Sequence, residues 1–195
     1  MKVSKTFRRV ALGSMLGTTA IMVSSQALAA FQFHVAVKGK KQGQFKGESV
    51  HDKRKDKWMP GVSFSWGGTA PRDTVTGQAT GRRQYQPLCF VRQAGQASPQ
   101  LLQAWATSEV LAEVNFEFTR TNANGEEYVY QTIKITDATV SKFAHFTSGS
   151  VNDTAKRTAS DSASPLEEMC FTFRKIDFEN KDGKTAFSDD WSSSI

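Results

Sequence analysis

The chain has few of the residues that build metal-held or disulfide-held folds. Its 195 residues include only two cysteines and three histidines. Two cysteines are too few for a disulfide scaffold, and they lack the spacing of a metal site. No two of the histidines, His34, His51 and His145, lie within chelating distance along the chain. We therefore expect no bound metal and no cofactor.

Motifs that carry enzyme chemistry are missing as well. No serine stands in a nucleophile elbow, no glycine loop has the spacing of a phosphate cradle, and neither cysteine has a histidine close by in the sequence. The acids that stand side by side are Glu126-Glu127, Glu167-Glu168 and Asp189-Asp190. Adjacent residues of a strand point to opposite faces, so such pairs suit shared acid and base work poorly. We interpret them as solvated edges and turn tips, and expect no catalytic residues and no enzyme.

No apolar stretch reaches the roughly 20 residues that a membrane-spanning helix needs. The longest, over residues 10–23, follows four basic residues and precedes Ala27-Leu28-Ala29-Ala30. That order is typical of a cleavable secretory signal. We predict a signal peptide over residues 1–29, cleaved between Ala29 and Ala30, and one domain over residues 30–195, with no stable membrane insertion. A retained anchor is the alternative, and Arg8-Arg9 leaves the general and twin-arginine routes open.

Much of the positive charge belongs to this leader. It holds four of the 25 basic residues and none of the 19 acidic ones, so the rest of the chain is close to +2. Eight of the remaining Lys and Arg residues lie between Lys38 and Lys57. The base-stacking aromatics that usually accompany phosphate-binding charges are missing there until Trp58. We interpret this stretch as a solvated basic loop and expect no nucleic-acid partner; an anion-binding surface is the alternative.

Alternating apolar and polar residues predict strands along most of the chain. The predicted strands cover residues 31–37, 62–66, 85–92, 110–120, 128–140 and 169–178. In the first, Phe31, Phe33, Val35 and Val37 share the inner face, so His34 points outward or into a subunit contact. In the second, Val62, Phe64 and Trp66 share a face. The last strand changes phase between Phe173 and Ile176, which predicts a bulge.

The segments between the strands predict one helix and several polar loops. Ser98 and Pro99 are typical of a helix start, and Leu101, Leu102 and Trp105 provide one apolar face. The loops cover residues 67–81 and 148–164, and Asn124-Gly125 provides the turn of a long hairpin. Many short strands with one helix favour a compact β-barrel or sandwich.

The two cysteines, Cys89 and Cys170, each lie within a predicted strand. A disulfide forms if the two strands are neighbours and the compartment is oxidising. Two separate, half-buried thiols are the other possibility. The sequence pattern leaves both states open.

One segment carries a family signature. Phe45-Lys46-Gly47-Glu48-Ser49, followed by the strand that ends Ser65-Trp66-Gly67-Gly68, resembles the haemolysin-coregulated proteins (Hcp), the tube subunits of type VI secretion systems. Later segments agree in order with that family, namely residues 87–92, 98–101, 127–140 and 166–178. The resemblance covers roughly residues 31–191.

This resemblance implies a mainly β fold, an Hcp-like β-barrel of two packed antiparallel sheets with one short flanking helix. It also implies a homo-oligomer, a hexameric ring that stacks into a tube, with the spike protein, the sheath and effector cargo as further partners. The loop over residues 38–58 corresponds to the family's loop that reaches a neighbouring subunit or ring. The candidate contact residues are therefore Phe45, Lys46, Gly47, Glu48, Ser49 and Trp58.

The predicted leader departs from the family pattern, because tube subunits normally assemble in the cytoplasm and leave through the secretion machine. Two hypotheses follow. The chain is a tube subunit, or it is an exported periplasmic or extracellular Hcp-like ring or binding protein that is not built into the tube. The leader predicts a secreted or periplasmic location. The sequence ends a few residues past the resemblance, so we expect no fused effector.

Overall fold

The computed structural model describes residues 32–51, 53–147 and 165–193. The predicted signal peptide with Ala29 and Ala30, and the predicted loop over residues 148–164, lie outside these ranges. The described elements are β1 (Gln32–Gly39), β2 (Gly43–Gln44), β3 (Met59–Gly61), β4 (Ser63–Ser65), β5 (Gly68–Thr69), β6 (Gln84–Tyr85), β7 (Leu88–Gln93), α1 (Ser98–Ala106), β8 (Leu111–Thr121), β9 (Glu127–Phe146), β10 (Leu166–Thr172), β11 (Lys175–Asn180) and β12 (Thr185–Asp190).

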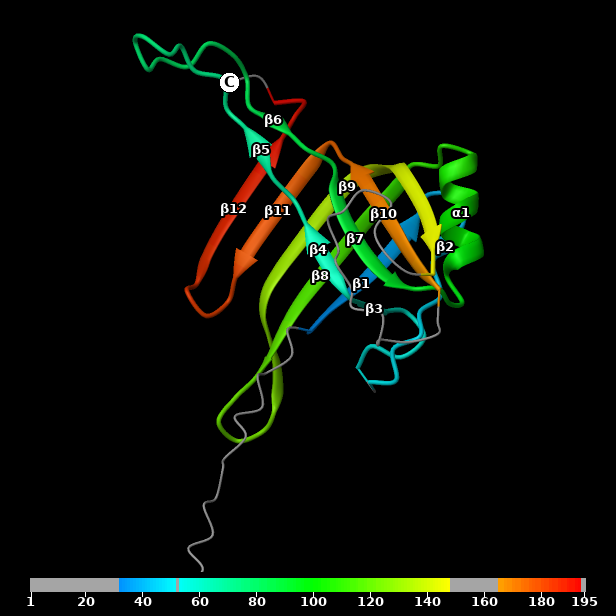
Figure 1. Cartoon of the computed structure of the whole chain (residues 1–195). Helices are drawn as coiled ribbons and strands as arrows, with labels where there is room; N and C mark the ends of the chain where they lie inside the picture. Colours follow the sequence, from blue (N-terminus) through cyan, green and yellow to red (C-terminus); the bar gives the residue numbers. More distant parts are fainter. Residues whose placement is uncertain (1–31, 52, 148–164, 194–195) are drawn as a thin grey trace, which may run out of the picture.

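The long strand β9 organises an antiparallel sheet with the order β2-β1-β8-β9-β10-β7-β4. Its first half pairs with both β8 and β11, and its second half pairs with β10. β12 extends the sheet beyond β11, and β5 pairs with β6 in a separate ribbon. Figure 1 shows this curved sheet with α1 on one side and β12 on the other. The predicted long hairpin is confirmed as β8 and β9.

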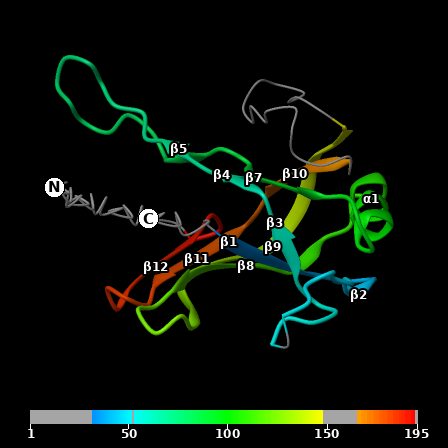
Figure 2. The same cartoon turned by 60° about the horizontal axis from the view of Figure 1, so that its bottom comes forward.

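The expected mainly β fold with one short helix is confirmed, but the strands do not close into a complete barrel. β3 pairs with β1 and β4 pairs with β7, and the two strands are separated at Val62. The chain passes from one layer to the other at this point (Figure 2). Gly61 permits the passage, because a Cβ there would lie 2.0 Å from the ring of Phe33.

The break also changes which residues of the second predicted strand are buried. Phe64 and Trp66 pack against the core as predicted, whereas Val62 is exposed. The prediction for Val62 was wrong because strict alternation does not continue across the interruption between β3 and β4.

Apolar side chains from the facing layers form one core. Phe33, Val35 and Val37 are fully buried, as predicted for the inner face of β1. The ring of Phe33 stacks on that of Phe118 with centroids 5.5 Å apart, and Phe64 meets Phe118 edge to face at 5.1 Å. Such aromatic pairs add to the stabilisation that burial of their area provides.

Helix α1 differs from the prediction in its first residue and in its buried face. Its N-cap residue is one position earlier than the predicted Ser98. Ala97 occupies the N-cap position without a side-chain cap, while the Ser98 hydroxyl accepts a hydrogen bond from the Gly95 N–H at 2.9 Å. Leu101 and Ala104 are buried. Leu102 and Trp105, which we expected to dock with Leu101, are exposed. Leu102 and Trp105 have the same three-residue spacing as Leu101 and Ala104, so the way the helix packs against the sheet decides which pair is buried.

The predicted last strand is two strands. β10 ends at Thr172 and β11 begins at Lys175, because the chain moves from the second half of β9 to its first half. The change of phase in the sequence therefore marks a break, and the predicted bulge between Phe173 and Ile176 was wrong. The register does shift within the pairing of β10 with β9, between Cys170 and Phe171.

No helix in the described part of the chain is long and apolar enough to cross a membrane.

Candidate subunit interface

The predicted contact segment is mainly an anchor within the chain. Phe45 is fully buried in the core. The Ser49 N–H donates to the Trp58 carbonyl at 2.9 Å, which ties the start of the loop to its end. Gly47 lies so close to Trp58 that a Cβ would be 2.3 Å from the same carbonyl oxygen. Among the candidate contact residues, only Lys46 is fully exposed.

Glu48 connects this loop to a buried arginine. Its Oε2 accepts a hydrogen bond from Arg92 Nη1 at 3.0 Å, and its Oε1 accepts one from the Ala97 N–H at 3.1 Å. Arg92 Nη2 also donates to Glu167 Oε2 at 3.2 Å and to the Ser98 hydroxyl at 2.9 Å. We call Arg92, Glu48, Glu167 and Ser98 the Arg92 cluster. It joins the loop, β7, β10 and the start of α1.

The Arg92 cluster corrects the interpretation of Glu167 as a solvated edge residue. Glu167 and Arg92 are each only 1% exposed. Arg92 lies in phase with the inward residues Leu88 and Phe90, and Glu167 lies in phase with Met169 and Phe171. This alternation was a usable signal that both charged side chains are buried. Their pairing depends on β7 and β10 being neighbours, which satisfies both charges.

A second buried arginine lies over the outer face of β1. Arg54 Nε donates to Glu117 Oε2 at 3.0 Å, and its Nη1 donates to Glu127 Oε1 at 2.6 Å. The expected solvated basic loop is thus only partly solvated, because Arg54 is buried. We call Arg54, Glu117, Glu127, His34 and His51 the Arg54 cluster.

His34 belongs to this cluster. It lies on the face of β1 opposite the core residues Phe33 and Val35, which agrees with the outward direction expected, but it is buried there. Burial, followed by the charge of Arg54, lowers the pKa of His34 below its usual value. Its Nδ1 has no hydrogen-bond partner within the described residues, and neither has Nδ1 of His51. The loop that carries Arg54 and His51 therefore acts on His34 against the charged form of the imidazole.

The surface that the loop presents to solvent is basic, with one apolar side chain. Val50 is exposed, and so are four lysines of the loop, which are Lys46, Lys53, Lys55 and Lys57. This set, which we call the loop surface, differs from the predicted contact residues because most of those pack inward.

Two other exposed apolar groups lie on different sides of the molecule. The helix patch consists of Leu102, Trp105 and Val110, and the β12 patch consists of Phe187 and Trp191. Figures 1 and 2 both place α1 and β12 at opposite sides of the sheet. Phe187, within a short strand, is 55% exposed. Exposed aromatic groups of this kind often mark protein contacts.

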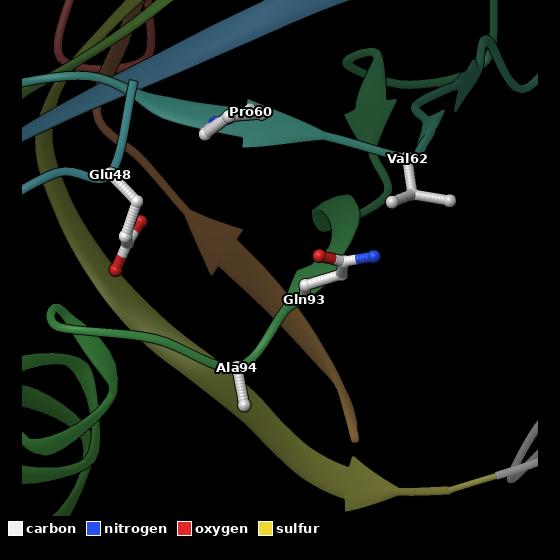
Figure 3. Close-up of a pocket in the computed structure, with 5 residues that line it drawn as sticks. All are labelled: Glu48, Pro60, Val62, Gln93 and Ala94. Carbon is white, nitrogen blue, oxygen red and sulfur yellow. The ribbon is translucent and has the colours of Figure 1, made fainter. Parts of the chain in front are cut away.

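A pocket of about 340 Å³ lies beside β3 and the end of β7. Figure 3 shows the residues that line it, which are Glu48, Pro60, Val62, Gln93 and Ala94. Of these, Glu48 is the charged one, and its carboxylate oxygens already accept hydrogen bonds from Arg92 and Ala97. Within the described part of the chain, the charged group of this pocket is thus already hydrogen-bonded.

Cys89 and Cys170, for which the sequence left two states open, are opposite residues on β7 and β10. They are joined in a disulfide, with their Cα atoms 4.0 Å apart. The bond connects the same two strands as the Arg92–Glu167 ion pair.

Comparisons with known proteins agree with the sequence signature. Residues 35–179 match the family described as "Type VI secretion system effector, Hcp". The "Major exported protein" of Pseudomonas aeruginosa is 31% identical over 125 residues, which cover 64% of this chain and 70% of that protein.

Solved structures show the same fold. The structure titled "Crystal structure of Hcp protein" has a TM-score of 0.69 at 23% identity and covers 82% of this chain and 99% of its own. An Hcp1 protein from Escherichia coli has a TM-score of 0.68 at 24% identity, with 83% and 99% covered. The secreted protein Hcp3 from Pseudomonas aeruginosa has a TM-score of 0.63 at 24% identity, with 84% and 100% covered.

Proposed function

Because the chain belongs to the Hcp family of type VI secretion proteins, we propose that it is a structural tube subunit with no catalytic activity of its own. Its copies join into hexameric rings, and the rings stack into a hollow tube that is expelled. The match over residues 35–179 is the observation that carries this proposal. The further partners are the spike protein, the sheath and effector cargo in the lumen.

The contact within a ring joins the helix patch of one copy to the β12 patch of the next. A closed ring of identical subunits needs a head-to-tail contact between two different surfaces. The two patches meet this need because they are apolar, exposed and placed on opposite sides of the sheet. Trp105 and Phe187 are the central side chains, since large aromatic residues dominate the energy of many interfaces.

The contact between rings uses the loop surface. Val50 is an exposed apolar side chain among lysines, and the loop beneath it is held in place by the Arg92 and Arg54 clusters. A loop held rigidly before assembly loses less conformational entropy on binding.

The mass of the native protein tests the ring. We expect a hexamer by light scattering after size exclusion. Trp105→Asp and Phe187→Asp should each give monomers, because each places a charge in an apolar contact. Val75→Asp changes another exposed apolar residue, which belongs to neither patch, and is the matched control. A wild-type protein that stays monomeric at high concentration would contradict the proposal.

The disulfide favours a second candidate function, an exported Hcp-like ring or binding protein that is not built into the tube. Disulfides persist in oxidising compartments and are rare in the cytoplasm, where a tube subunit would assemble. The signal-like N-terminal sequence favours the same route.

Cell fractionation with N-terminal sequencing and thiol titration separates the two roles. A chain that begins at Ala30, lies in the periplasm and has no free thiol supports the second function. A chain that keeps Met1, is found in sheared external tubes and has two titratable thiols supports the first.

A further inference from the structure

The outer face of β7 and β10 carries a group of side chains that includes the disulfide and one carboxylate beside it. The sulfur atoms of Cys89 and Cys170 and a carboxylate oxygen of Glu168 all lie within 4.8 Å of one another. Within residues 32–51, 53–147 and 165–193, these are the three side chains of metal-ligating type whose ligand atoms lie within that distance of one another. Two of its members are joined in the disulfide.

The strand register gives this group the arrangement of a three-ligand site. Glu168 and Cys170 are two residues apart on β10, so they point to the same face. Cys89 lies opposite Cys170 on β7. A tetrahedral cation with bonds of about 2.0 to 2.3 Å holds its ligand atoms roughly 3.3 to 3.8 Å apart. Once the disulfide is reduced, rotation of the cysteine side chains has to move the sulfur atoms apart to this separation.

The charges around the group suit a divalent cation. Two thiolates and one carboxylate carry three negative charges. Lys142 offsets one of them, because its Nζ lies 2.8 Å from Glu168 Oε2 and it stands opposite Cys170 on β9. A nearby ammonium also favours thiolate over thiol. The site therefore has a net charge near −2, and a bound divalent ion leaves it neutral.

We propose that the dithiol form of the protein binds a soft divalent cation such as Zn²⁺ through Cys89 Sγ, Cys170 Sγ and one oxygen of Glu168. The fourth position is open to water, as in zinc sites with three protein ligands. Two thiolates select Zn²⁺ over Mg²⁺ or Ca²⁺, which prefer oxygen ligands.

Metal binding and the disulfide exclude each other. Reduction breaks the S–S bond with two electrons from a small-molecule dithiol, which becomes a disulfide itself, and leaves two thiols on the protein. Binding of the cation then releases the two thiol protons. The cation is thus held only where the cysteines are kept reduced. In an oxidising compartment the disulfide removes both thiolate ligands.

A Co²⁺ titration of the full-length, reduced protein without oxygen tests the proposal. We expect thiolate-to-cobalt absorption that saturates at about one metal per chain. Cys89→Ser should lose this absorption, and Glu168→Gln should weaken Co²⁺ binding by about tenfold or more. Glu113→Gln is the matched control, since Glu113 is also a strand carboxylate paired with a lysine, Lys134, at 3.2 Å. The disulfide form should bind no Co²⁺ at this position.

A second measurement on the wild-type protein avoids variants that fail to fold. The rate at which iodoacetamide alkylates the reduced cysteines should fall when Zn²⁺ is added and stay the same with Mg²⁺. The proposal is overturned if thiolate absorption is missing, if Cys89→Ser binds Co²⁺ as the wild type does, or if Zn²⁺ leaves alkylation unchanged.

Discussion

Arginine side chains join distant segments both in the Arg92 cluster and beside β12, but their exposed fractions differ. In the Arg92 cluster, the arginine is 1% exposed. Beside β12, Arg83 pairs with Asp189, and Arg174 pairs with Asp137 and Asp190. These arginine side chains are 31% and 41% exposed. We call this second network the β12 clasp.

The β12 clasp holds the ribbon of β5 and β6 against the end of the chain. The Tyr85 hydroxyl donates to Asp189 at 2.5 Å, and the Tyr85 ring meets that of Trp191 at 5.9 Å. Hydrogen bonds from Ser192, followed by the charge of Arg174, lower the pKa of Asp190. Water reaches the two arginines and Asp190. The Asp189 side chain is only 10% exposed, but it has two donors, Arg83 and the Tyr85 hydroxyl.

The difference in depth decides how much each network contributes. Removing one partner of a buried pair leaves an uncompensated charge and costs about 3 to 5 kcal/mol. An exposed pair usually contributes about 0 to 1 kcal/mol, because water and salt screen it. The loop side therefore depends on a complete network, whereas the side that carries the β12 patch tolerates change.

The largest expected effect is that of Arg92→Met. It should lower the free energy of unfolding by about 3 to 5 kcal/mol. The buried Glu167 carboxylate loses its arginine and keeps the partly exposed His145, whose Nδ1 lies 3.4 Å from Glu167 Oε1. Urea unfolding measures the change. The double variant with Glu167→Leu should regain much of the loss, since it removes both charges. A single variant as stable as the wild type would mean that water reaches Glu167.

Reduction of the disulfide tests the same pair of strands without a mutation. The bond closes a loop between cysteines 81 positions apart, so its loss should reduce stability by about 2 to 4 kcal/mol. Urea unfolding with and without a reductant measures the difference. Reduction of Cys89→Ser, which has no bond to lose, should change nothing. An equal effect on both proteins would contradict a role for the bond.

The Arg54 cluster should make stability depend on pH. The pKa of His34 is lower in the folded chain than its usual 6.5, so the unfolded chain binds the proton more readily. Stability is therefore complete above about pH 6.5 and falls as the pH drops from there toward the folded pKa. Thermal unfolding between pH 7.5 and 5 measures this slope. His34→Gln should flatten it, and a variant with the wild-type slope would contradict the assignment.

The smallest expected effect belongs to the β12 clasp. Arg83→Met should change the free energy of unfolding by no more than about 1 kcal/mol, because Arg83 is partly exposed and Asp189 keeps the Tyr85 hydroxyl as a donor. Amide exchange in the ribbon of β5 and β6 should become faster nonetheless, since its tie to Asp189 is lost. Urea unfolding and hydrogen exchange measure the two effects. A loss as large as that of Arg92→Met would remove the distinction between the two networks.

Much of the fold was predictable because its signals are local. Alternation along β1, β7, β8 and β9 indicated strands, and Asn124-Gly125 indicated the turn of the long hairpin. The exposed face of α1 was not predictable from spacing alone. Leu102 and Trp105 are as apolar as Leu101, and only the position of the helix against the sheet decides which of them is buried.

The amino-acid sequence by itself determined the family, the antiparallel strands and helix α1, because periodicity and a signature segment are properties of neighbouring residues. Only the tertiary structure decided that Glu48, Arg92 and Glu167 meet, that Arg54 covers His34, and that Cys89 lies opposite Cys170. These contacts join residues tens of positions apart. Their partners depend on strand order and register, which long-range packing selects and no local pattern encodes.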